Sequence, residues 1–353
     1  MKNIQVIIWG LGAMGSGMAE LLLTKKGVDI VGAVGRGEKI GKSMYDFLSV
    51  KRGSRPDVII GSAEDVIKEK SADVVLLCTD SFTAKAFDKI KFILERKVNV
   101  ITSAEEMSYP QAQNPDLAAK IDKIAKDNGV SVLGTGINPG LIMDLLVILM
   151  TGCCYEVEHI TARRVNSLSP FGPAVMEEQG IGITESAFRD MVKKGELAGH
   201  VGFSESIRMI ADAIGWKVDK ITQSMEPILT EFDRRSPYGF AAAGNVAGCA
   251  MKGQGYVDGK VKIDMDHPQQ IEPEQAGVHT GDYVIIKGKP DVNLANTPEV
   301  PGGIGTVAMC VNMIPHIINA RPGLKTMIDL PVPRVIMGDM RELVCEEARV
   351  VRG

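Results

Sequence analysis

Short apolar runs alternate with amphipathic stretches through the first 136 residues of the chain. The runs are rich in β-branched residues, which predicts buried strands at 4–9, 29–34, 57–60, 73–78, 99–102 and 130–134. Residues typical of helix starts lie between them at Ser62, Ser81 and Asn114. This alternation predicts an α/β fold, namely a Rossmann-type doubly wound parallel sheet.

The pattern changes after Gly140. Residues 141–150 predict a strongly apolar helix, and the stretch from 156 to about 300 mixes strand and helix patterns joined by Gly/Pro turns. This mixture indicates a second, α+β domain with an open mixed sheet. Residues 302–320 predict another apolar helix, which returns to the first domain. The expected domains are 1–137 with about 302–353, and 138–301.

Composition restricts the class of protein. Of the 353 residues 45% are hydrophobic and the formal net charge is −4, which excludes a disordered chain. The balanced charge gives no reason to expect nucleic acid or an anionic membrane as partner. Apolar runs are too short to span a bilayer, and the first residues lack a signal-peptide pattern. Six Cys without CxxC spacing predict free thiols in a cytoplasmic protein and no metal site.

A glycine-rich turn follows the first predicted strand directly. The GxGxxG pattern needs its first glycine for a tight turn, its second for close approach to a pyrophosphate, and its third for helix packing. The amide groups of the following helix then point at the phosphates. We therefore predict a dinucleotide site made by Gly10, Leu11, Gly12, Ala13, Met14 and Gly15.

The second predicted strand indicates which dinucleotide binds. An NAD site usually has an acidic residue at the end of this strand, whereas this chain has Gly35 followed by Arg36. An arginine can bind the 2′-phosphate of NADP with two hydrogen bonds, so NADP is favoured and NAD is the alternative. Cys78, Thr79 and Ser81 follow the fourth strand, where we expect them to line the nicotinamide ribose.

Several longer motifs resemble one enzyme family. They are TSAEEMSYP (102–110), GTGINPGLIMD (134–144), GHVGFSES (199–206) and EVPGGIGTVAMCVNMIPHIINARPG (299–323). Together with the glycine turn they are similar to the 2,4-diaminopentanoate dehydrogenases, which belong to the dihydrodipicolinate-reductase-like superfamily beside the amine dehydrogenases. The resemblance implies NAD(P)-dependent deamination of 2,4-diaminopentanoate at C4 in ornithine degradation. None of the five histidines has a histidine neighbour, unlike dihydrodipicolinate reductase proper.

The implied reaction needs a base beside the substrate amine, and a carboxylate can take that role. Glu105 and Glu106 come directly after the fifth predicted strand, at the carboxyl edge of the sheet. Adjacent side chains do not share a face, so one of the two is expected to be the base. By the resemblance, Glu106 matches the acid that is catalytic in the amine dehydrogenases, with Glu105 as the alternative. A structural role at a helix start is the competing interpretation.

The substrate carboxylate needs cationic or polar partners. Arg163 and Arg164 lie on a predicted strand and point to opposite faces, so one of them is expected to bind substrate, with a slight preference for Arg163. His267 is a second candidate for the carboxylate, and His200 could orient substrate or cap a helix. Asn138 precedes Pro139 and is a candidate for holding the nicotinamide carboxamide or the substrate amine, or for a turn.

Three hypotheses of function follow. The first is a 2,4-diaminopentanoate dehydrogenase that acts on a small molecule as a homodimer or larger oligomer. The second is an amine dehydrogenase acting on amines that carry no carboxylate. The third belongs to another class, a nucleotide-sensing protein that binds a dinucleotide without turnover.

Overall fold

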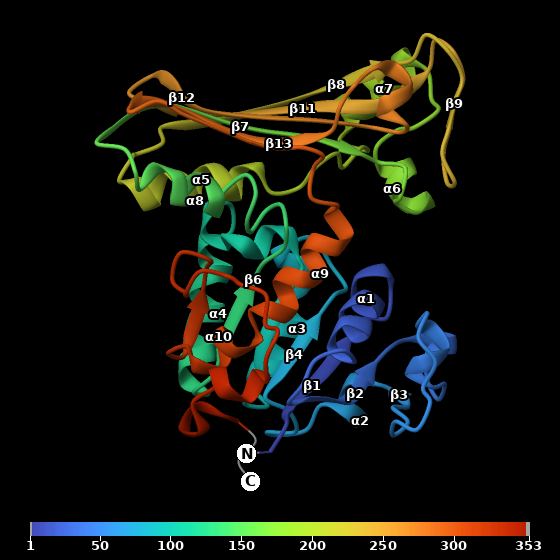
Figure 1. The fold of residues 1–353 in the computed structure, drawn as a ribbon, viewed down its shortest axis with the longest axis vertical. Coiled ribbons are helices and arrows are strands. Elements are labelled where there is room, and N and C mark those ends of the chain that lie inside the picture. The colour runs from blue at the N-terminus through green and yellow to red at the C-terminus, as the bar shows by residue number, and fades with distance from the viewer. Residues whose placement is uncertain (1, 351–353) are drawn as a thin grey trace. The chain divides into compact units, whose positions relative to one another are not determined.

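The chain forms two compact units, seen in a computed structural model that describes residues 2–350. Unit 1 combines the chain up to Leu141 with the segment from Gly302 onward, and unit 2 is Ile142–Pro301 (Figure 1). The apolar segment after Gly302 therefore returns to the unit that contains the glycine turn.

Unit 1 is built on a seven-stranded sheet in which all neighbouring strands are parallel. The strand order is β15-β6-β5-β4-β1-β2-β3, and this order reverses direction between β1 and β4. The predicted Rossmann-type doubly wound sheet is confirmed. Its strands are β1 (Ile4–Trp9), β2 (Val28–Val34), β3 (Ile60–Gly61), β4 (Val74–Leu77), β5 (Asn99–Thr102), β6 (Ser131–Gly134) and β15 (Gly323–Lys325).

Helices cover both faces of this sheet (Figure 1). Side chains such as Ile90 and Ile121 pack with Ile7 of β1 on one face, whereas Gly15 meets Ile8 of β1 on the other. On that second face the first helix packs against the returning segment. The helices are α1 (Ala13–Leu22), α2 (Ala63–Val66), α3 (Thr83–Leu94), α4 (Pro115–Asp127), α9 (Gly302–Asn312) and α10 (Ile314–Asn319).

The structure corrects the bounds of three predicted elements. The helix expected from residue 141 begins at Leu145, because the Asp144 carboxylate accepts a hydrogen bond from the Leu145 amide at 2.6 Å and acts as N-cap. The helix expected over 302–320 breaks at Met313, because Pro315 lacks the amide hydrogen that would continue it.

The third corrected element is the strand predicted over 57–60. Only its end pairs with β2, where Ile60 lies opposite Ala33. The preceding residues pair with the segment around Ser43 and not with β2. The Met44 amide donates to the Val58 carbonyl at 2.8 Å, and Ile59 forms an antiparallel bridge with Ser43.

Unit 2 contains a six-stranded mixed sheet, so the predicted α+β domain is confirmed. The strand order is β14-β13-β7-β12-β11-β8, and only β7 and β12 are parallel among these described pairs. The strands are β7 (Glu156–Ser167), β8 (Lys220–Leu229), β11 (Val246–Val257), β12 (Lys260–Gln270), β13 (Gly281–Lys289) and β14 (Val292–Asn296), with a separate pair β9 (Arg234–Arg235) and β10 (Phe240–Ala241).

The two faces of the unit 2 sheet differ in character. One face packs against α8 (Phe203–Ile214), which also contacts α5 (Leu145–Thr151) (Figure 1). The other carries ion pairs between neighbouring strands, such as Arg163 Nε with Asp266 Oδ2 at 2.8 Å. Because side chains alternate along a strand, adjacent residues of β7 reach these two different environments. Two further helices of this unit are α6 (Pro173–Glu178) and α7 (Glu185–Lys194).

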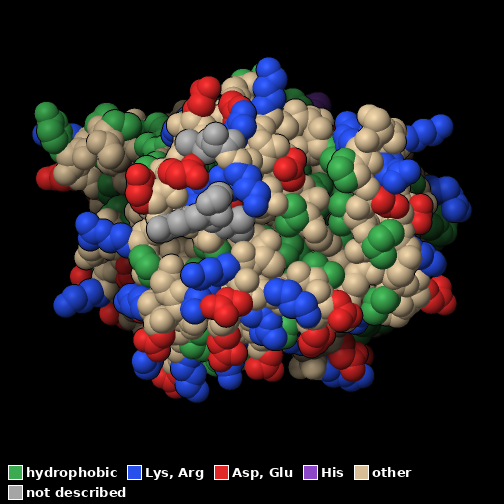
Figure 2. Space-filling view, turned by 90° about the horizontal axis from the view of Figure 1, so that it is seen from below, with side chains coloured by type: hydrophobic (Ala, Val, Ile, Leu, Met, Phe, Trp, Pro, Cys, Tyr) green, Lys and Arg blue, Asp and Glu red, His purple; other side chains and the backbone are tan. Residues whose placement is uncertain are grey.

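Charged side chains of both signs are mixed over the face that surrounds the chain termini, where neither sign forms an extended patch among the side chains coloured by type (Figure 2). This agrees with 40 Lys and Arg against 44 Asp and Glu in the sequence. In the described part of the chain, no helix combines the length and apolar character that crossing a membrane requires.

A buried ion pair joins the last described residues to the start of the chain. Arg349 Nη2 lies 2.7 Å from Asp73 Oδ2, and both side chains are fully buried. The same guanidinium donates to the carbonyl oxygens of Lys2 at 2.6 Å and Asn3 at 2.8 Å. Breaking a buried pair leaves the remaining charge uncompensated, so this contact is expected to stabilise unit 1.

We expect Arg349→Met to lower the free energy of unfolding by about 3–5 kcal/mol, because the buried Asp73 charge would lose the opposite charge that compensates it. Urea unfolding monitored by circular dichroism measures this loss. Lys97→Met is the matched control, since it removes the exposed Lys97–Glu69 pair at 2.6 Å, which is worth about 1 kcal/mol or less. Equal losses in the two variants would contradict the assignment.

Candidate active site

The glycine turn joins β1 to α1 and requires glycine at two positions. Gly10 has a φ of +102°, and a Cβ there would lie 2.8 Å from the Cys78 carbonyl oxygen. A Cβ on Gly15 would lie 1.8 Å from the Gly10 carbonyl oxygen. Both positions are therefore fixed by backbone packing within unit 1.

The middle glycine of the turn has a different environment. A Cβ on Gly12 would meet nothing within 4 Å, so this position borders open space. Gly12 is also the N-cap of α1, and no side chain caps the helix there. Open space beside uncapped helix amides is what a pyrophosphate needs, so the turn fits a dinucleotide. The residues between, Leu11, Ala13 and Met14, complete the turn and the start of α1.

The end of β2 lies against the beginning of the turn, because the Gly10 amide donates to the Val34 carbonyl at 3.0 Å. Arg36 follows two residues later and is exposed. Sequence analysis missed Lys39, whose Nζ donates to the Leu11 carbonyl oxygen at 2.5 Å. Only the folded chain could reveal this contact, because it joins the region after β2 to the glycine turn.

The loop after β4 touches the glycine turn from the other side. The Cβ position of Gly10 is 2.9 Å from Thr79 Cγ2 and closer still to Cys78. The Cys78 thiol contacts Met18 Sδ at 3.4 Å, and burial raises the pKa of this thiol to about 12. Asp80, in the same loop, forms an ion pair with Lys89 at 2.5 Å.

The Glu106 carboxylate acts at the start of a helix other than its own. Glu106 Oε2 accepts hydrogen bonds from the Thr83 amide at 2.7 Å and from Asn114 Nδ2 at 3.2 Å. Thr83 is the first residue of α3, whose N-cap, Phe82, offers no capping side chain. The expected cap, Ser81, is therefore wrong: Ser81 instead accepts from the Glu106 amide through its carbonyl, at 3.1 Å. Glu105 precedes Glu106 in the same short helix.

The two neighbouring arginines of β7 do lie in different environments. The Arg164 side chain is 2% exposed, whereas that of Arg163 is 45% exposed. Arg163 pairs with Asp266 at 2.8 Å, on the face that carries the ion pairs. Arg164 forms a buried ion pair with Asp282 of β13. The structure thus places Arg164, and not Arg163, among buried side chains.

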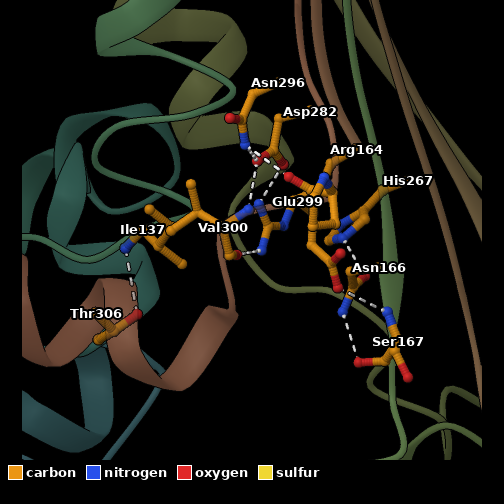
Figure 3. Close-up of polar contacts among 11 residues, drawn as sticks. Ile137, Arg164, Asn166, Ser167, His267, Asp282, Asn296, Glu299, Val300 and Thr306 are labelled. Carbon is orange, nitrogen blue, oxygen red and sulfur yellow. Dashed lines mark hydrogen bonds and ion pairs between the residues drawn. The ribbon is translucent and has the colours of Figure 1, made fainter. Parts of the chain in front are cut away.

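The Arg164–Asp282 pair also holds the last segment of unit 2 (Figure 3). Arg164 Nη2 donates to the Val300 carbonyl at 2.6 Å, and the Val300 amide donates to Asp282 Oδ2 at 2.8 Å. One residue earlier, Glu299 Oε1 accepts from the Ser167 amide at 3.2 Å. Arg164 uses two of its five N–H groups in these contacts.

Two histidines lie together near Arg164. The rings of His200 and His267 are 4.7 Å apart, and both pack beside Phe203. Burial and then the Arg164 charge lower the pKa of His200 to about 3. Burial, with His200 and Arg164, also holds the pKa of His267 well below its usual value. Both rings are therefore neutral at neutral pH.

The neutral His267 ring is held by one hydrogen bond (Figure 3). His267 Nε2 lies 2.9 Å from Asn166 Oδ1, and we assign the proton to Nε2 because Oδ1 accepts. Among the described residues, the buried His267 Nδ1 has no hydrogen-bond partner. This orphaned acceptor could receive a hydrogen bond from a bound group.

Asn138 lies in unit 1, in the segment that follows β6. The hydroxyl oxygen of Thr306, in α9, accepts a hydrogen bond from the Ile137 amide at 3.2 Å and fixes this segment (Figure 3). Asn138 is half-buried beside that contact. In residues 2–350 no group of three or more His, Cys, Asp or Glu side chains is arranged to hold a metal ion.

Comparison with known proteins gives consistent matches over the chain. A family model described as the 2,4-diaminopentanoate dehydrogenase C-terminal domain matches residues 141–346. A 2,4-diaminopentanoate dehydrogenase from Acetoanaerobium sticklandii is 74% identical over 353 residues, which is 100% of both chains. An amine dehydrogenase from Streptomyces virginiae is 25% identical over 241 residues, covering 63% of this chain and 65% of its own.

A solved structure shares the whole fold. The amine dehydrogenase from Mycobacterium smegmatis superposes with a TM-score of 0.84 at 27% identity, covering 96% of this chain and 98% of its own.

We expect stability to fall on acidification, because the unfolded chain binds a proton at His267 that the folded chain does not. The contribution of His267 to the free energy of unfolding is fully present above the usual histidine pKa of about 6.5. Below a pH of about 6.5 it falls by about 1.4 kcal/mol per pH unit. His267→Gln, which keeps a donor for Asn166, should remove the His267 part of the slope between about pH 6.5 and 5, whereas His200, whose pKa is also lowered, keeps its own part. Urea unfolding at each pH measures it. The exposed His279 provides the control variant, His279→Gln, and an unchanged slope in H267Q would refute the expectation.

Proposed function

The chain belongs to the 2,4-diaminopentanoate dehydrogenase family, and from this premise we propose that it deaminates 2,4-diaminopentanoate oxidatively at C4. The observation that supports this proposal most strongly is the 74% identity over the full length of a 2,4-diaminopentanoate dehydrogenase. The amine, water and an oxidised nicotinamide dinucleotide give 2-amino-4-oxopentanoate, ammonia, the reduced dinucleotide and a proton. A dinucleotide bound at the glycine turn would accept the hydride from C4.

The proposed dinucleotide is NADP in preference to NAD. Gly35 supplies no carboxylate to repel a 2′-phosphate, and the exposed Arg36 is positioned after β2 to bind one. The Gly10–Gly15 turn is proposed to hold the pyrophosphate. Cys78, Thr79 and Ser81 are proposed to border the nicotinamide ribose, chiefly through their backbone, since the Cys78 thiol contacts Met18.

Glu106 is the proposed base. It would take a proton from the substrate ammonium before hydride transfer and release it to solvent, and it would then take a proton from the water that adds to the iminium. Both hydrogen bonds to its carboxylate end on Oε2, and among the described residues Oε1 accepts none. The Thr83 and Asn114 contacts thus orient the carboxylate while Oε1 is available. Glu105 is the alternative base.

The amino-acid end of the substrate is proposed to bind at Arg164, His267 and His200. Arg164 retains three N–H groups beyond its contacts with Asp282 and Val300. The geometry favours it over Arg163, which already pairs with Asp266 on the other sheet face. A neutral His200 would donate a hydrogen bond to the carboxylate rather than a charge. His267 Nδ1 carries no proton while Nε2 donates to Asn166, so it would instead accept a hydrogen bond from the 2-ammonium group of the substrate. Asn138 is proposed to hold the carboxamide or the amine, and the homodimer and cytoplasmic location stay predictions.

The activity is tested by incubating the purified protein with 2,4-diaminopentanoate and either NADP or NAD. We expect the ultraviolet absorbance of reduced nicotinamide to appear together with ammonia and 2-amino-4-oxopentanoate, detected by mass spectrometry. We expect a higher kcat/KM with NADP than with NAD. Pentan-2-amine, which lacks the carboxylate, should be a much poorer substrate.

Two outcomes would support the other hypotheses. Equal kcat/KM for pentan-2-amine and diaminopentanoate would indicate an amine dehydrogenase that does not recognise the substrate carboxylate. Dinucleotide binding by calorimetry with no turnover of either amine would indicate a nucleotide-sensing protein.

We expect Glu106→Gln to lower kcat by about 10²–10⁴-fold, because it removes the base. The Gln amide oxygen can still accept from Thr83, so circular dichroism and thermal unfolding should show a folded protein. Glu105→Gln is the comparison and should retain most of the turnover. If E105Q lost activity and E106Q kept it, the base would be Glu105, and the assignment of Glu106 would be wrong.

A further inference from the structure

Lys39 occupies a position between the end of β2 and the glycine turn. It ends the short helix Gly37–Lys39 that follows Arg36. Its ammonium group donates to the Leu11 carbonyl oxygen at 2.5 Å and lies 4.6 Å from the centre of the Phe47 ring. These two contacts hold a positive charge directly beside the second residue of the GxGxxG pattern.

The side chain of Lys39 also starts next to the position where an acidic residue would stand in an NAD site. A Cβ added to Gly35 would lie 2.6 Å from Ile60 Cγ2 and 3.4 Å from Lys39 Cβ. An Asp or Glu at position 35 therefore requires the β-branched Ile60 side chain to shift. The packing around Gly35 thus disfavours the usual ribose-binding acid, and Lys39 fills the neighbouring volume.

The positive charges at this edge of unit 1 are not neutralised by ion pairs. In residues 2–350 neither Arg36 nor Lys39 lies within salt-bridge distance of a carboxylate, although the exposed Glu38 stands between them in sequence. An ammonium group has three N–H donors, and Leu11 takes one of those of Lys39. Two donors are left for an anion.

We propose that Lys39 is a specificity-determining residue that binds the 2′-phosphate of NADP together with Arg36. This inference rests on the proposed use of a dinucleotide at the glycine turn. Arg36 provides a planar guanidinium on the exposed side, and Lys39 provides a point charge anchored to the turn. A 2′-hydroxyl, as in NAD, gains far less from two cations than a phosphate does.

The contact with Leu11 gives Lys39 a second possible role that the experiment must separate. In a trans peptide the Leu11 carbonyl and the Gly12 amide point in opposite directions. By holding the Leu11 carbonyl, Lys39 orients the Gly12 amide away from itself. This orientation would favour the binding of any nucleotide and not of NADP alone. If Lys39 had only this positioning role, its loss would lower the affinity for nucleotides with and without a 2′-phosphate equally.

The test uses calorimetry on the full-length protein with two fragments of the dinucleotide, 2′,5′-ADP and 5′-AMP. For Lys39→Met we expect the Kd for 2′,5′-ADP to rise about 10- to 100-fold, as for the loss of a charged hydrogen bond. The Kd for 5′-AMP should change less than about 3-fold, within the range of small packing effects. Lys39→Arg keeps the charge and should restore most of the selectivity.

Lys42→Met is the matched control, because Lys42 is exposed in the same segment and only its backbone makes hydrogen bonds. It should leave both Kd values unchanged. Equal weakening of both ligands in K39M, or no weakening, would overturn the proposal. A third result is a wild type that binds 5′-AMP and oxidises diaminopentanoate with NAD without preferring 2′,5′-ADP. That result would overturn the Lys39 proposal and leave the proposed function standing. A wild type that binds neither ligand would contradict the proposed function as well.

Discussion

The close approach of α1 to the turn before it determines how unit 1 is assembled. At Gly15 there is no room for a side chain, since a Cβ would lie 1.8 Å from the Gly10 carbonyl oxygen. The start of α1 therefore lies directly on the end of β1, with its amides directed toward the open space at Gly12. The same helix accepts α9 at close range, where a Cβ on Gly17 would lie 2.9 Å from Val307. Dinucleotide binding and the return of the chain after unit 2 both depend on this packing.

Local sequence pattern predicted the parts of the fold that local physics decides. The buried strands at β1, β4, β5 and β6 follow from short apolar runs, and their parallel order follows from the helices between them. Helix ends were less predictable, because caps and breaks decide them. Asp144 delays one helix, and Pro315 divides another. At α3 the group that satisfies the first amide is Glu106, which is distant in sequence.

The candidate site shows the same limit. Strand alternation predicted that Arg163 and Arg164 face opposite ways, but not which of them is buried, because that depends on the helices that cover one sheet face. Lys39 could not be recognised at all, since its significance comes from a contact with Leu11. Arg164 is costly to bury, and its pairing with Asp282 and Val300 offsets that cost through several hydrogen bonds.

Unit 1 is interrupted by unit 2, which has consequences during synthesis on the ribosome. β15, the outermost strand of the parallel sheet beside β6, emerges only after all of unit 2 has been made. Until then β6 presents an unpaired edge of the kind that favours association between nascent chains. Unit 2 is contiguous in sequence and can complete its own sheet first. Translation thus leaves an interval in which a chaperone would protect one exposed β-edge while the intervening unit folds.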